Sequence, residues 1–352
     1  MSGSAASRFA VAWLVVSLMV LGGFQATSGE SRAVDPDRLA LLETRLDELR
    51  ARWNVPGMSA AIVKDGRLMW AKGFGHADVA HRRPAAPDTV YHLASLTKPF
   101  AAVVLLQALE AGQLDLETPV SRYGIELESQ GTIRVKHLFT HTSEGVPGET
   151  YRYHGARFGE LDKVITAVTG ASFAAAVSAR ILEPLALRDT SPNPAQAQSC
   201  AEAKRDAEGF GRRLAQGYDS AGVTPVPYPR HFGAAAGLVS TVEDVGRFSI
   251  ALDDDRLLRA ETRQRAFAPS RSTKGERLPY GLGWFVQESN GLTLVWHYGL
   301  WTGTSSLILK VPQRQVTFVV LANSDGLSRP FALGSGDVLR SPFAREFLAV
   351  SW

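Results

Sequence analysis

One short segment of the sequence pairs a serine with a lysine at a spacing that favours chemistry between them. The segment Ser95-Leu96-Thr97-Lys98 opens a strongly apolar stretch that continues to Leu106. Residues three apart share one face of a helix, so the Lys98 amine can reach the Ser95 hydroxyl. Burial in an apolar helix would lower the pKa of the amine, which could then accept a proton. The two residues could therefore act as a nucleophile and its base.

Chance alone can supply this spacing, because a chain of 352 residues should contain Ser-x-x-Lys about once. It occurs once here, and Pro99 follows it at a position where the first turn of a helix accepts proline. Beyond Pro99 the stretch is apolar on nearly every side, which predicts a helix that runs through the interior. The spacing therefore marks a site only if other segments of the chain support it.

The rest of the composition is typical of a globular protein with a large core. Of the 352 residues, 45% are hydrophobic and 21% are charged, which allows one large domain or two lobes. The formal net charge is +3 and the basic residues are scattered, so we do not expect nucleic acid as a partner. Cys200 is the single cysteine, which excludes an intrachain disulfide, and its polar surroundings contain no obvious base.

The N-terminal residues have the pattern of an export signal. Arg8 precedes the apolar run 9–21, and a segment with small residues follows at 22–26. The run is shorter than the ~20 residues that a membrane-spanning helix needs. We therefore expect residues 1–28 to be a signal peptide and the protein to be exported, either periplasmic or secreted. The alternative is an uncleaved membrane anchor formed by residues 9–24.

Elements from both ends of the chain are expected to surround Ser95. An amphipathic helix begins at Pro36, and two strands joined by the turn Asp65-Gly66 follow it. Helices and loops dominate from about 97 to 235, and strands return near residue 280. The expected strands are 58–64, 67–74, 280–287, 293–297, 305–311 and 315–322, and the expected later helices are 135–142, 158–169, 173–182 and 336–350.

This order of elements predicts an α/β (α+β) fold. A central antiparallel sheet would be assembled from both chain ends and flanked by helices. A helical lobe at roughly 97–235 would be inserted into it, and residues 29–352 would form one catalytic domain. The sequence contains no Gly-x-Ser-x-Gly segment, which disfavours an α/β-hydrolase.

The segments that accompany Ser95 occur in an order that resembles a known superfamily. They are 87–91, 138–145, 151–153, 185–190, 236–244, 280–284, 297–299 and 321–323. Together with Ser95-Leu96-Thr97-Lys98 they resemble the serine β-lactamase and penicillin-binding-protein superfamily, which has Ser-x-x-Lys as a signature. The likeness covers residues 36 to 325 and is closest to the branch of class C β-lactamases, D-amino-acid peptidases and family VIII esterases. It implies a β-lactamase/DD-peptidase-like fold.

The resemblance also implies roles for individual residues near Ser95. Ser95 would be the acylated nucleophile, Lys98 its activating partner, and Tyr153 a second proton carrier. A phenol has an unperturbed pKa near 10, and an adjacent ammonium would lower it enough to move a proton. Tyr151 remains the alternative to Tyr153. No metal and no other cofactor is implied.

The third motif of the superfamily would be His297-Tyr298-Gly299. The backbone of this segment would line the acyl pocket. The N–H of Leu300 and that of Ser95 would form the oxyanion hole, which stabilises the negative charge of a tetrahedral intermediate. These two backbone groups complete the expected acyl-transfer site.

Two departures from the superfamily pattern bear on the substrate. Gly155 stands where an asparagine is usual, which removes an amide expected to bind a substrate carbonyl and to contact the lysine. Tyr298 replaces the usual threonine, and His297 replaces the lysine of the β-lactamases. A histidine leaves less fixed positive charge for a substrate carboxylate. The departures argue against efficient β-lactam or D-alanyl-carboxylate chemistry, and they leave Ser–Lys–Tyr acyl transfer intact.

We therefore expect a serine hydrolase that forms a covalent acyl-enzyme on a small-molecule or peptide ester or amide. A carboxylesterase or a D-amino-acid peptidase-like activity is favoured. The alternatives are a true β-lactamase, a transacylase, and a non-catalytic module that binds the cell wall or β-lactams. Membrane contact is expected only through an uncleaved N-terminal segment, and the oligomeric state is left open.

A pair of histidines suggests a different kind of site. His137 and His141 are four residues apart, as metal ligands on a helix often are. Neither a glutamate nor a third acidic ligand follows in the pattern of a zinc site. We therefore expect both histidines to support the loop near the site rather than to bind a metal.

Overall fold

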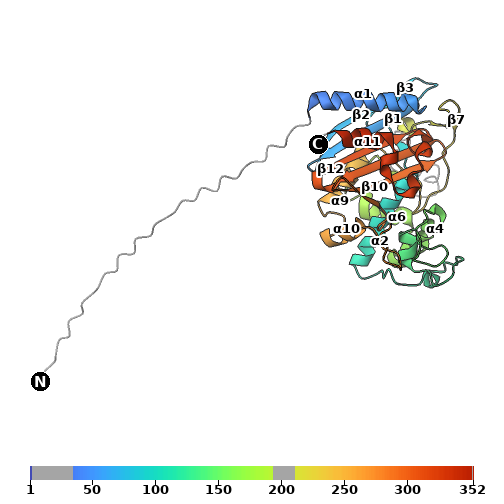
Figure 1. Ribbon diagram of the computed structural model, residues 1–352, viewed down its shortest axis with the longest axis vertical. Helices are drawn as coiled ribbons and strands as arrows, with labels where there is room; N and C mark the ends of the chain where they lie inside the picture. Colours follow the sequence, from blue (N-terminus) through green and yellow to red (C-terminus); the bar gives the residue numbers. More distant parts are fainter. Residues whose placement is uncertain (2–34, 193–210, 351) are drawn as a thin grey trace. The chain divides into compact units, whose positions relative to one another are not determined.

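The computed structural model describes residues 1, 35–192, 211–350 and 352. Val34–Trp352 form one compact unit (Figure 1). Apart from Met1, the predicted signal peptide at 1–28 and the alternative anchor at 9–24 lie outside the described residues, as does Cys200.

A seven-stranded antiparallel sheet forms the centre of this unit, as predicted. Its strand order is β3-β2-β1-β12-β11-β10-β9, so the N-terminal strands lie beside the C-terminal ones. The two ends meet where β1 pairs with β12, with Met58 opposite Ala322 and Lys64 opposite Val316. The strands are β1 Gly57–Lys64, β2 Arg67–Asp78, β3 Arg83–Pro84, β9 Phe285–Ser289, β10 Leu292–Trp301, β11 Thr304–Val311 and β12 Val316–Ala322.

The hairpin of β1 and β2 is closed by Asp65 and Gly66, as predicted. Both residues have positive φ angles, 50° and 71°, which a two-residue type I′ turn requires. Aspartate tolerates the left-handed conformation better than most residues, and glycine has no Cβ to oppose it. Strand β2 continues beyond its predicted end at residue 74 to Asp78.

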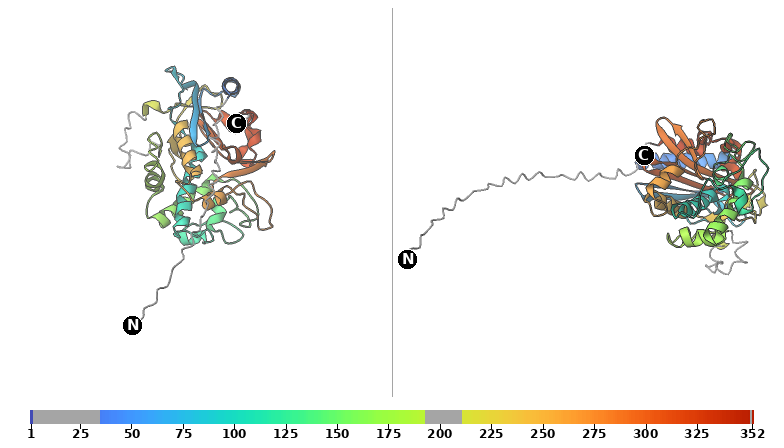
Figure 2. Two further views of the ribbon diagram at one scale, coloured as in Figure 1. Left: turned by 90° about the vertical axis from the view of Figure 1, so that its left-hand side faces the viewer. Right: turned by 90° about the horizontal axis from the view of Figure 1, so that it is seen from below.

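Helices cover both faces of the sheet. Alternating side chains send Phe318 of β12 to one face and its neighbour Val319 to the other. The first face packs on α1 (Pro36–Arg52) and α11 (Pro342–Ala349), and the second on α9 (Val242–Asp253) and on the helices after Ser95. Figure 2 shows α1 and α11 on one side of the sheet and α9 on the other.

Further helices and short strands lie between β3 and β9, in addition to α9. They are β4 Tyr91–His92, η1 Ala94–Thr97, α2 Lys98–Glu110, η2 Val120–Tyr123, α3 Val135–Phe139, α4 Gly155–Gly159, α5 Leu161–Thr169, α6 Phe173–Val177, η3 Ser178–Leu182, β5 Ser191–Pro192, β6 Gly217–Tyr218, β7 Pro225–Val226, β8 Leu238–Ser240 and α10 Ala260–Ala266. In the described part of the chain no single helix is long and apolar enough to cross a membrane. The pair Gly155–Thr169 and Phe173–Leu182, bent by 70°, meets those criteria only together.

A small sheet that the sequence did not predict joins the segment before Ser95 to a segment after the lobe. Its order is β4-β8-β5. Tyr91 of β4 pairs with Ser240 of β8, and His92 pairs with Val239. Strands of two or three residues show no periodicity, so only the tertiary structure reveals this connection.

Several predicted elements have different bounds in the structure. The helix expected at 135–142 ends at Phe139, and the strand expected at 293–297 extends from Leu292 to Trp301. The strand expected at 280–287 begins at Phe285, because Gly283 has a φ of +85° and a Cβ on Gly281 would lie 2.3 Å from the Ala266 carbonyl oxygen. The helix expected at 158–169 is divided into α4 and α5. The closing helix expected at 336–350 consists of η8 (Val338–Arg340) and α11, which starts at a proline.

Candidate active site

Ser95 lies on a tight turn that holds its hydroxyl towards solvent. It belongs to the 3-10 turn η1, and it is the one residue from Tyr91 to Phe100 that is not buried. Ala94 before it has a φ of +49°, a left-handed conformation that costs a non-glycine residue about 1–2 kcal/mol. Its N–H donates to His92 Nδ1 at 3.0 Å, which stabilises the turn. The strain therefore lies next to the candidate nucleophile.

Lys98 is fully buried and its amine reaches Ser95. Its Nζ donates to Ser95 Oγ and to the carbonyl oxygen of Ala235, both at 2.9 Å. The ring centroids of Tyr153 and Phe158 lie 5.2 and 5.4 Å from Nζ. Burial lowers the pKa of the amine from 10.5 to about 7, because the ammonium would lose its hydration. The predicted reach of Lys98 and the predicted fall of its pKa are both confirmed.

Tyr153 lies just before α4, with its hydroxyl buried. Burial and then the nearby Tyr298 hold the Tyr153 pKa well above 10, and the Ser95 side chain offsets only part of this rise. The prediction that an ammonium would lower this pKa is wrong, because burial of the Tyr153 hydroxyl dominates. Tyr153 is therefore a neutral phenol, and Lys98 is the group able to take the first proton.

Tyr151, the alternative to Tyr153, uses its hydroxyl elsewhere. Its Oη donates to the carbonyl oxygen of Gly334 at 3.1 Å. The Tyr151 ring packs on Tyr280 and Phe285, at centroid distances of 6.3 and 6.5 Å. The geometry therefore favours Tyr153 as the tyrosine beside the serine and lysine.

The segment His297-Tyr298-Gly299 lies on β10, which runs beside the Ser95 turn. A Cβ on Gly299 would lie 2.1 Å from the Leu93 carbonyl oxygen, so only glycine allows this close approach. Strand β9 pairs with β10 only as far as Trp296. Beyond Trp296, the edge of β10 that faced β9 pairs with no other strand among the described residues, and Leu300 lies in this unpaired part. This strand edge is where the predicted oxyanion N–H of Leu300 belongs, a role that stays a prediction.

His297 is buried and held as a neutral ring. Its Nδ1 donates to the carbonyl oxygen of Tyr298 at 2.7 Å, and its Nε2 accepts from the Tyr280 hydroxyl at 2.9 Å. Burial, with Lys98 nearby, lowers the His297 pKa well below 6.5. The position therefore carries no fixed positive charge at neutral pH.

Gly155 leaves an open space beside the lysine. It is the first residue of α4, and a Cβ built there would lie 3.9 Å from Lys98 Nζ. A longer side chain at this position would reach the amine, as the resemblance implied for an asparagine. With glycine, Lys98 has the Ala235 carbonyl oxygen and Ser95 as its partners.

Three groups at the site were missed from the sequence. The Ala235 carbonyl oxygen has no sequence signal, because every residue carries one. Tyr280, the partner of His297, lies in a segment that carried the resemblance but received no role. His92, which holds the Ala94 N–H, precedes the serine by three positions and could have been examined as its neighbour.

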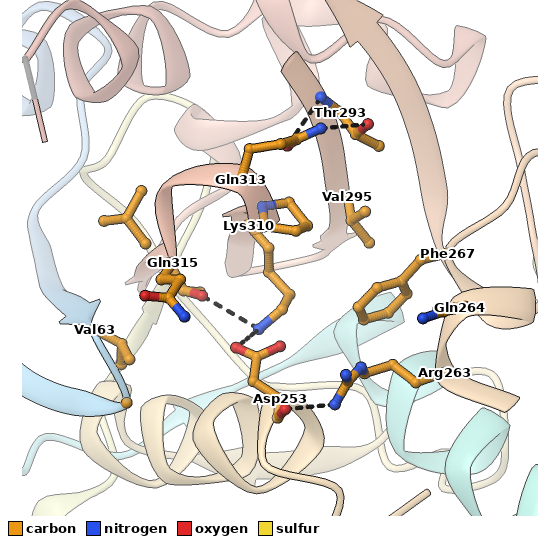
Figure 3. A pocket seen from close by; sticks show the side chains of 14 residues that line it. Val63, Asp253, Arg263, Gln264, Phe267, Thr293, Val295, Lys310, Gln313 and Gln315 are labelled. Carbon is orange, nitrogen blue, oxygen red and sulfur yellow. Dashed lines mark hydrogen bonds and ion pairs between the residues drawn. The ribbon is translucent and has the colours of Figure 1, made fainter. Parts of the chain in front are cut away.

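A second serine and lysine, Ser249 and Lys310, meet elsewhere. Lys310 lines a cavity of about 420 Å³ whose lining does not include Ser95 (Figure 3). Lys310 Nζ there binds Ser249, Thr317 at 3.2 Å and the Asp253 carboxylate at 2.8 Å. Ser249 is fully buried, and burial lowers the pKa of the Lys310 amine, a fall that the Asp253 carboxylate offsets only in part. The hydroxyl of this pair is buried and its amine is held by the ion pair with Asp253, so we assign the pair a structural role.

Comparisons with known proteins agree with this geometry. A family model described as Beta-lactamase matches residues 42–337. "Protein flp" of Staphylococcus aureus strain MW2 is 27% identical over 328 residues, which cover 80% of this chain and 62% of that protein. "Penicillin-binding protein 4*" of Bacillus subtilis strain 168 is 24% identical over 328 residues, covering 81% and 71%. The chain thus matches less than two thirds of the length of the flp proteins.

Solved structures show the same fold. The octameric penicillin-binding protein homologue from Pyrococcus abyssi superposes with a TM-score of 0.74 and 26% identity, covering 88% of this chain and 77% of its own. The D-amino acid amidase from Ochrobactrum anthropi SV3 superposes with a TM-score of 0.71 and 21% identity, covering 89% and 98%. Since the family model spans most of the chain, including the Ser95–Lys98 pair and β10, the chain belongs to the beta-lactamase family.

Proposed function

We propose that this protein is a serine hydrolase that forms an acyl-enzyme on Ser95 and acts on uncharged carboxylic esters. The observation that carries the proposal is the hydrogen bond between an accessible hydroxyl and a buried amine. Lys98 Nζ lies 2.9 Å from Ser95 Oγ, and its pKa of about 7 leaves much of it as free amine at neutral pH. A base with a pKa near the working pH is the most effective proton acceptor.

The proposed reaction begins with attack of Ser95 Oγ on the substrate carbonyl carbon while Lys98 Nζ takes the hydroxyl proton. The carbonyl π electrons move to its oxygen, and the N–H groups of Ser95 and Leu300 would bind this oxyanion. As the carbonyl re-forms and the ester C–O bond breaks, Tyr153 would pass its proton to the leaving alcohol and recover one from the Lys98 ammonium. Water then attacks the acyl-enzyme while Lys98 takes a proton from it. The C–O bond to Ser95 breaks as this proton returns through the same relay to Ser95 Oγ.

The charges around Ser95 support an uncharged acyl group rather than one with a free carboxylate. His297 is neutral where the β-lactamases carry a lysine, and Gly155 offers no amide to a substrate carbonyl. The rings of Phe285 and Tyr298 lie 5.6 Å from that of Tyr153, so the surroundings of its hydroxyl are mainly aromatic. Without a fixed cation, a substrate carboxylate would lose hydration without gaining an ion pair.

Amide hydrolysis is the second candidate. It is supported by the likeness to the D-amino acid amidase, of which the match covers 98%. An amine leaving group needs a proton before it departs, so this reaction would depend on Tyr153 even more than ester hydrolysis does.

A substrate panel with active-site labelling tests the proposal. Short-chain nitrophenyl esters, a chromogenic cephalosporin, D-amino acid amides and D-Ala-D-Ala peptides are compared by kcat/KM. A fluorophosphonate probe is located by mass spectrometry. We expect the esters to be turned over fastest and the probe to modify Ser95. Faster turnover of the cephalosporin would contradict the ester assignment, and a folded protein unlabelled at Ser95 would contradict the hydrolase assignment.

Replacing Tyr153 by phenylalanine is expected to lower kcat by about 10²–10⁴-fold, the range for loss of an acid–base group. The fold should be unaffected, because phenylalanine keeps the ring and its packing on Phe285 and Tyr298. Tyr151→Phe is the matched control, since its hydroxyl binds the Gly334 carbonyl oxygen instead. Steady-state kinetics with the best ester and a thermal melt check both variants. A larger loss of kcat in Tyr151→Phe would move the role to Tyr151.

A further inference from the structure

His141 holds the backbone on both sides of Tyr153. It follows α3, and its carbonyl oxygen accepts the N–H of Arg152 at 2.9 Å. Its ring Nδ1 accepts the N–H of His154 at 3.1 Å. These two peptide groups flank Tyr153, so one residue from another part of the chain fixes the tyrosine backbone at either end.

The ring of His141 also packs directly on the Tyr153 ring. The centroids of these two rings are 4.4 Å apart. The Tyr280 ring also contacts the His141 ring, edge to face, at a centroid distance of 4.7 Å. The Tyr153 ring lies in turn 5.2 Å from Lys98 Nζ. His141, Tyr153 and Lys98 therefore form one continuous packed row that ends at Ser95.

Stability alone does not explain a histidine at this position. Since Nδ1 accepts a hydrogen bond, the ring proton is on Nε2, which is buried and has no hydrogen-bond partner among the described residues. His141 also has a φ of +56°, a left-handed conformation that is uncommon for non-glycine residues, although histidine adopts it more often than most of them. An unpaired donor and a strained backbone both act against folding, and such costs concentrate at functional sites.

His137 makes the same kind of bond without touching Tyr153. It is buried, and its Nδ1 accepts the N–H of Arg134 at 3.1 Å, at the start of α3. Both histidines thus support loops near the site, as the sequence predicted. Only the bond of His141 reaches the peptide next to Tyr153, which makes His137 a matched control.

We propose that His141 is a positioning residue that holds the Tyr153 hydroxyl between Ser95 and Lys98. The proposal rests on the proposed function, because it requires Tyr153 to carry a proton during acyl transfer. His141 touches neither the substrate nor the reacting atoms. It acts through the peptide N–H of His154 and through its contact with the Tyr153 ring.

Single substitutions separate this role from a structural one. We expect His141→Ala to lower kcat by about 10²-fold, the effect of displacing a reacting group by 1 Å, with a much smaller change in KM. His141→Asn should recover a large part of kcat, because its Oδ1 can occupy the place of Nδ1 and asparagine tolerates φ near +56°. His141→Gln places its amide one bond farther away and should remain as slow as His141→Ala. His137→Ala should change the melting temperature while kcat stays near that of the wild type.

A double-mutant cycle tests whether His141 acts through Tyr153. In a Tyr153→Phe background we expect His141→Ala to cause little further loss of kcat, because the group that it positions is already absent. Losses that multiply would overturn the proposal, and so would a Tyr153→Phe variant with wild-type kcat. If His141→Ala does not fold, the comparison of His141→Asn with His141→Gln decides, and equal kcat values in those two variants would overturn the proposal.

The same measurements show whether the proposed function itself has failed. Hydrolysis that persists in Ser95→Ala would contradict the acyl-enzyme mechanism whatever His141 does. Hydrolysis that requires Ser95, combined with losses that multiply in the double mutant, would overturn the role of His141 alone.

Discussion

Replacement of Ser95 by alanine is expected to lower kcat for the best ester by a factor on the order of 10⁶, as loss of the nucleophile does in a serine protease. The variant keeps Lys98 and the neighbouring backbone but has no oxygen to form the acyl bond. Fluorophosphonate labelling at position 95 should disappear. Ester hydrolysis by the purified variant, followed over hours, and intact-protein mass spectrometry check both expectations.

The fold should survive this change, since Ser95 is only partly buried and alanine keeps the backbone bond from the Lys98 N–H to the carbonyl oxygen at position 95. A thermal melt of the variant is therefore the control. Turnover within about a hundredfold of the wild type would be far above the residual rate expected without a nucleophile, and it would place the nucleophile elsewhere.

Lys98→Met is expected to cost nearly as much activity as Ser95→Ala, because a nucleophile and its base act as a unit. Methionine has a similar length and no charge, so it fits the buried site. The substitution leaves the carbonyl oxygen of Ala235 without its hydrogen bond, which lowers the stability of the fold. It also removes the penalty for burying an amine, which raises the stability. The variant should thus be inactive with a melting temperature near that of the wild type.

The matched control for this variant is Lys310→Met. Lys310 is also buried and also meets a serine, but it lines the separate cavity in Figure 3. Its replacement removes the ion pair with Asp253 and should lower stability while kcat changes little. Equal losses of kcat in the two lysine variants would contradict a special role for Lys98.

The pH dependence follows from the same lysine. As the pH falls through about 7, Lys98 takes up a proton and can no longer accept one from Ser95, so kcat/KM should fall by roughly tenfold per pH unit below that value. Between about 7 and 10.5 the unfolded chain binds more protons at this lysine than the folded chain does. This lysine therefore makes the free energy of unfolding rise with pH across that window, and Lys98→Met should remove the contribution.

Local features could be read from the sequence with good accuracy. The Ser95–Lys98 hydrogen bond joins residues three apart, and the turn at Asp65 and Gly66 joins neighbours, so short-range geometry is enough for both. The antiparallel sheet followed from the positions of the strands near both chain ends. The resemblance supplied Tyr153 and the β10 segment, which periodicity alone does not indicate.

Burial determines the protonation states of Tyr153 and His297. The Tyr153 pKa was predicted to fall and instead lies well above 10, because the hydroxyl is surrounded by aromatic rings rather than by charge. His297 was expected to leave little positive charge, and its bonds to Tyr280 and to its own strand hold it as a neutral ring. A pKa depends on the solvation of a group, which no spacing of residues reports.

By itself, then, the sequence indicated the serine, its lysine and an antiparallel sheet assembled from both chain ends. Only the tertiary structure decided how far the Lys98 pKa falls, to about 7, that Ala235 is its second partner, and that His141 holds the backbone of Tyr153. The first group depends on contacts between near neighbours and on patterning. The second group of features depends on which residues, distant in the chain, exclude water from Lys98 and Tyr153. These residues come together only when the lobe packs against the sheet.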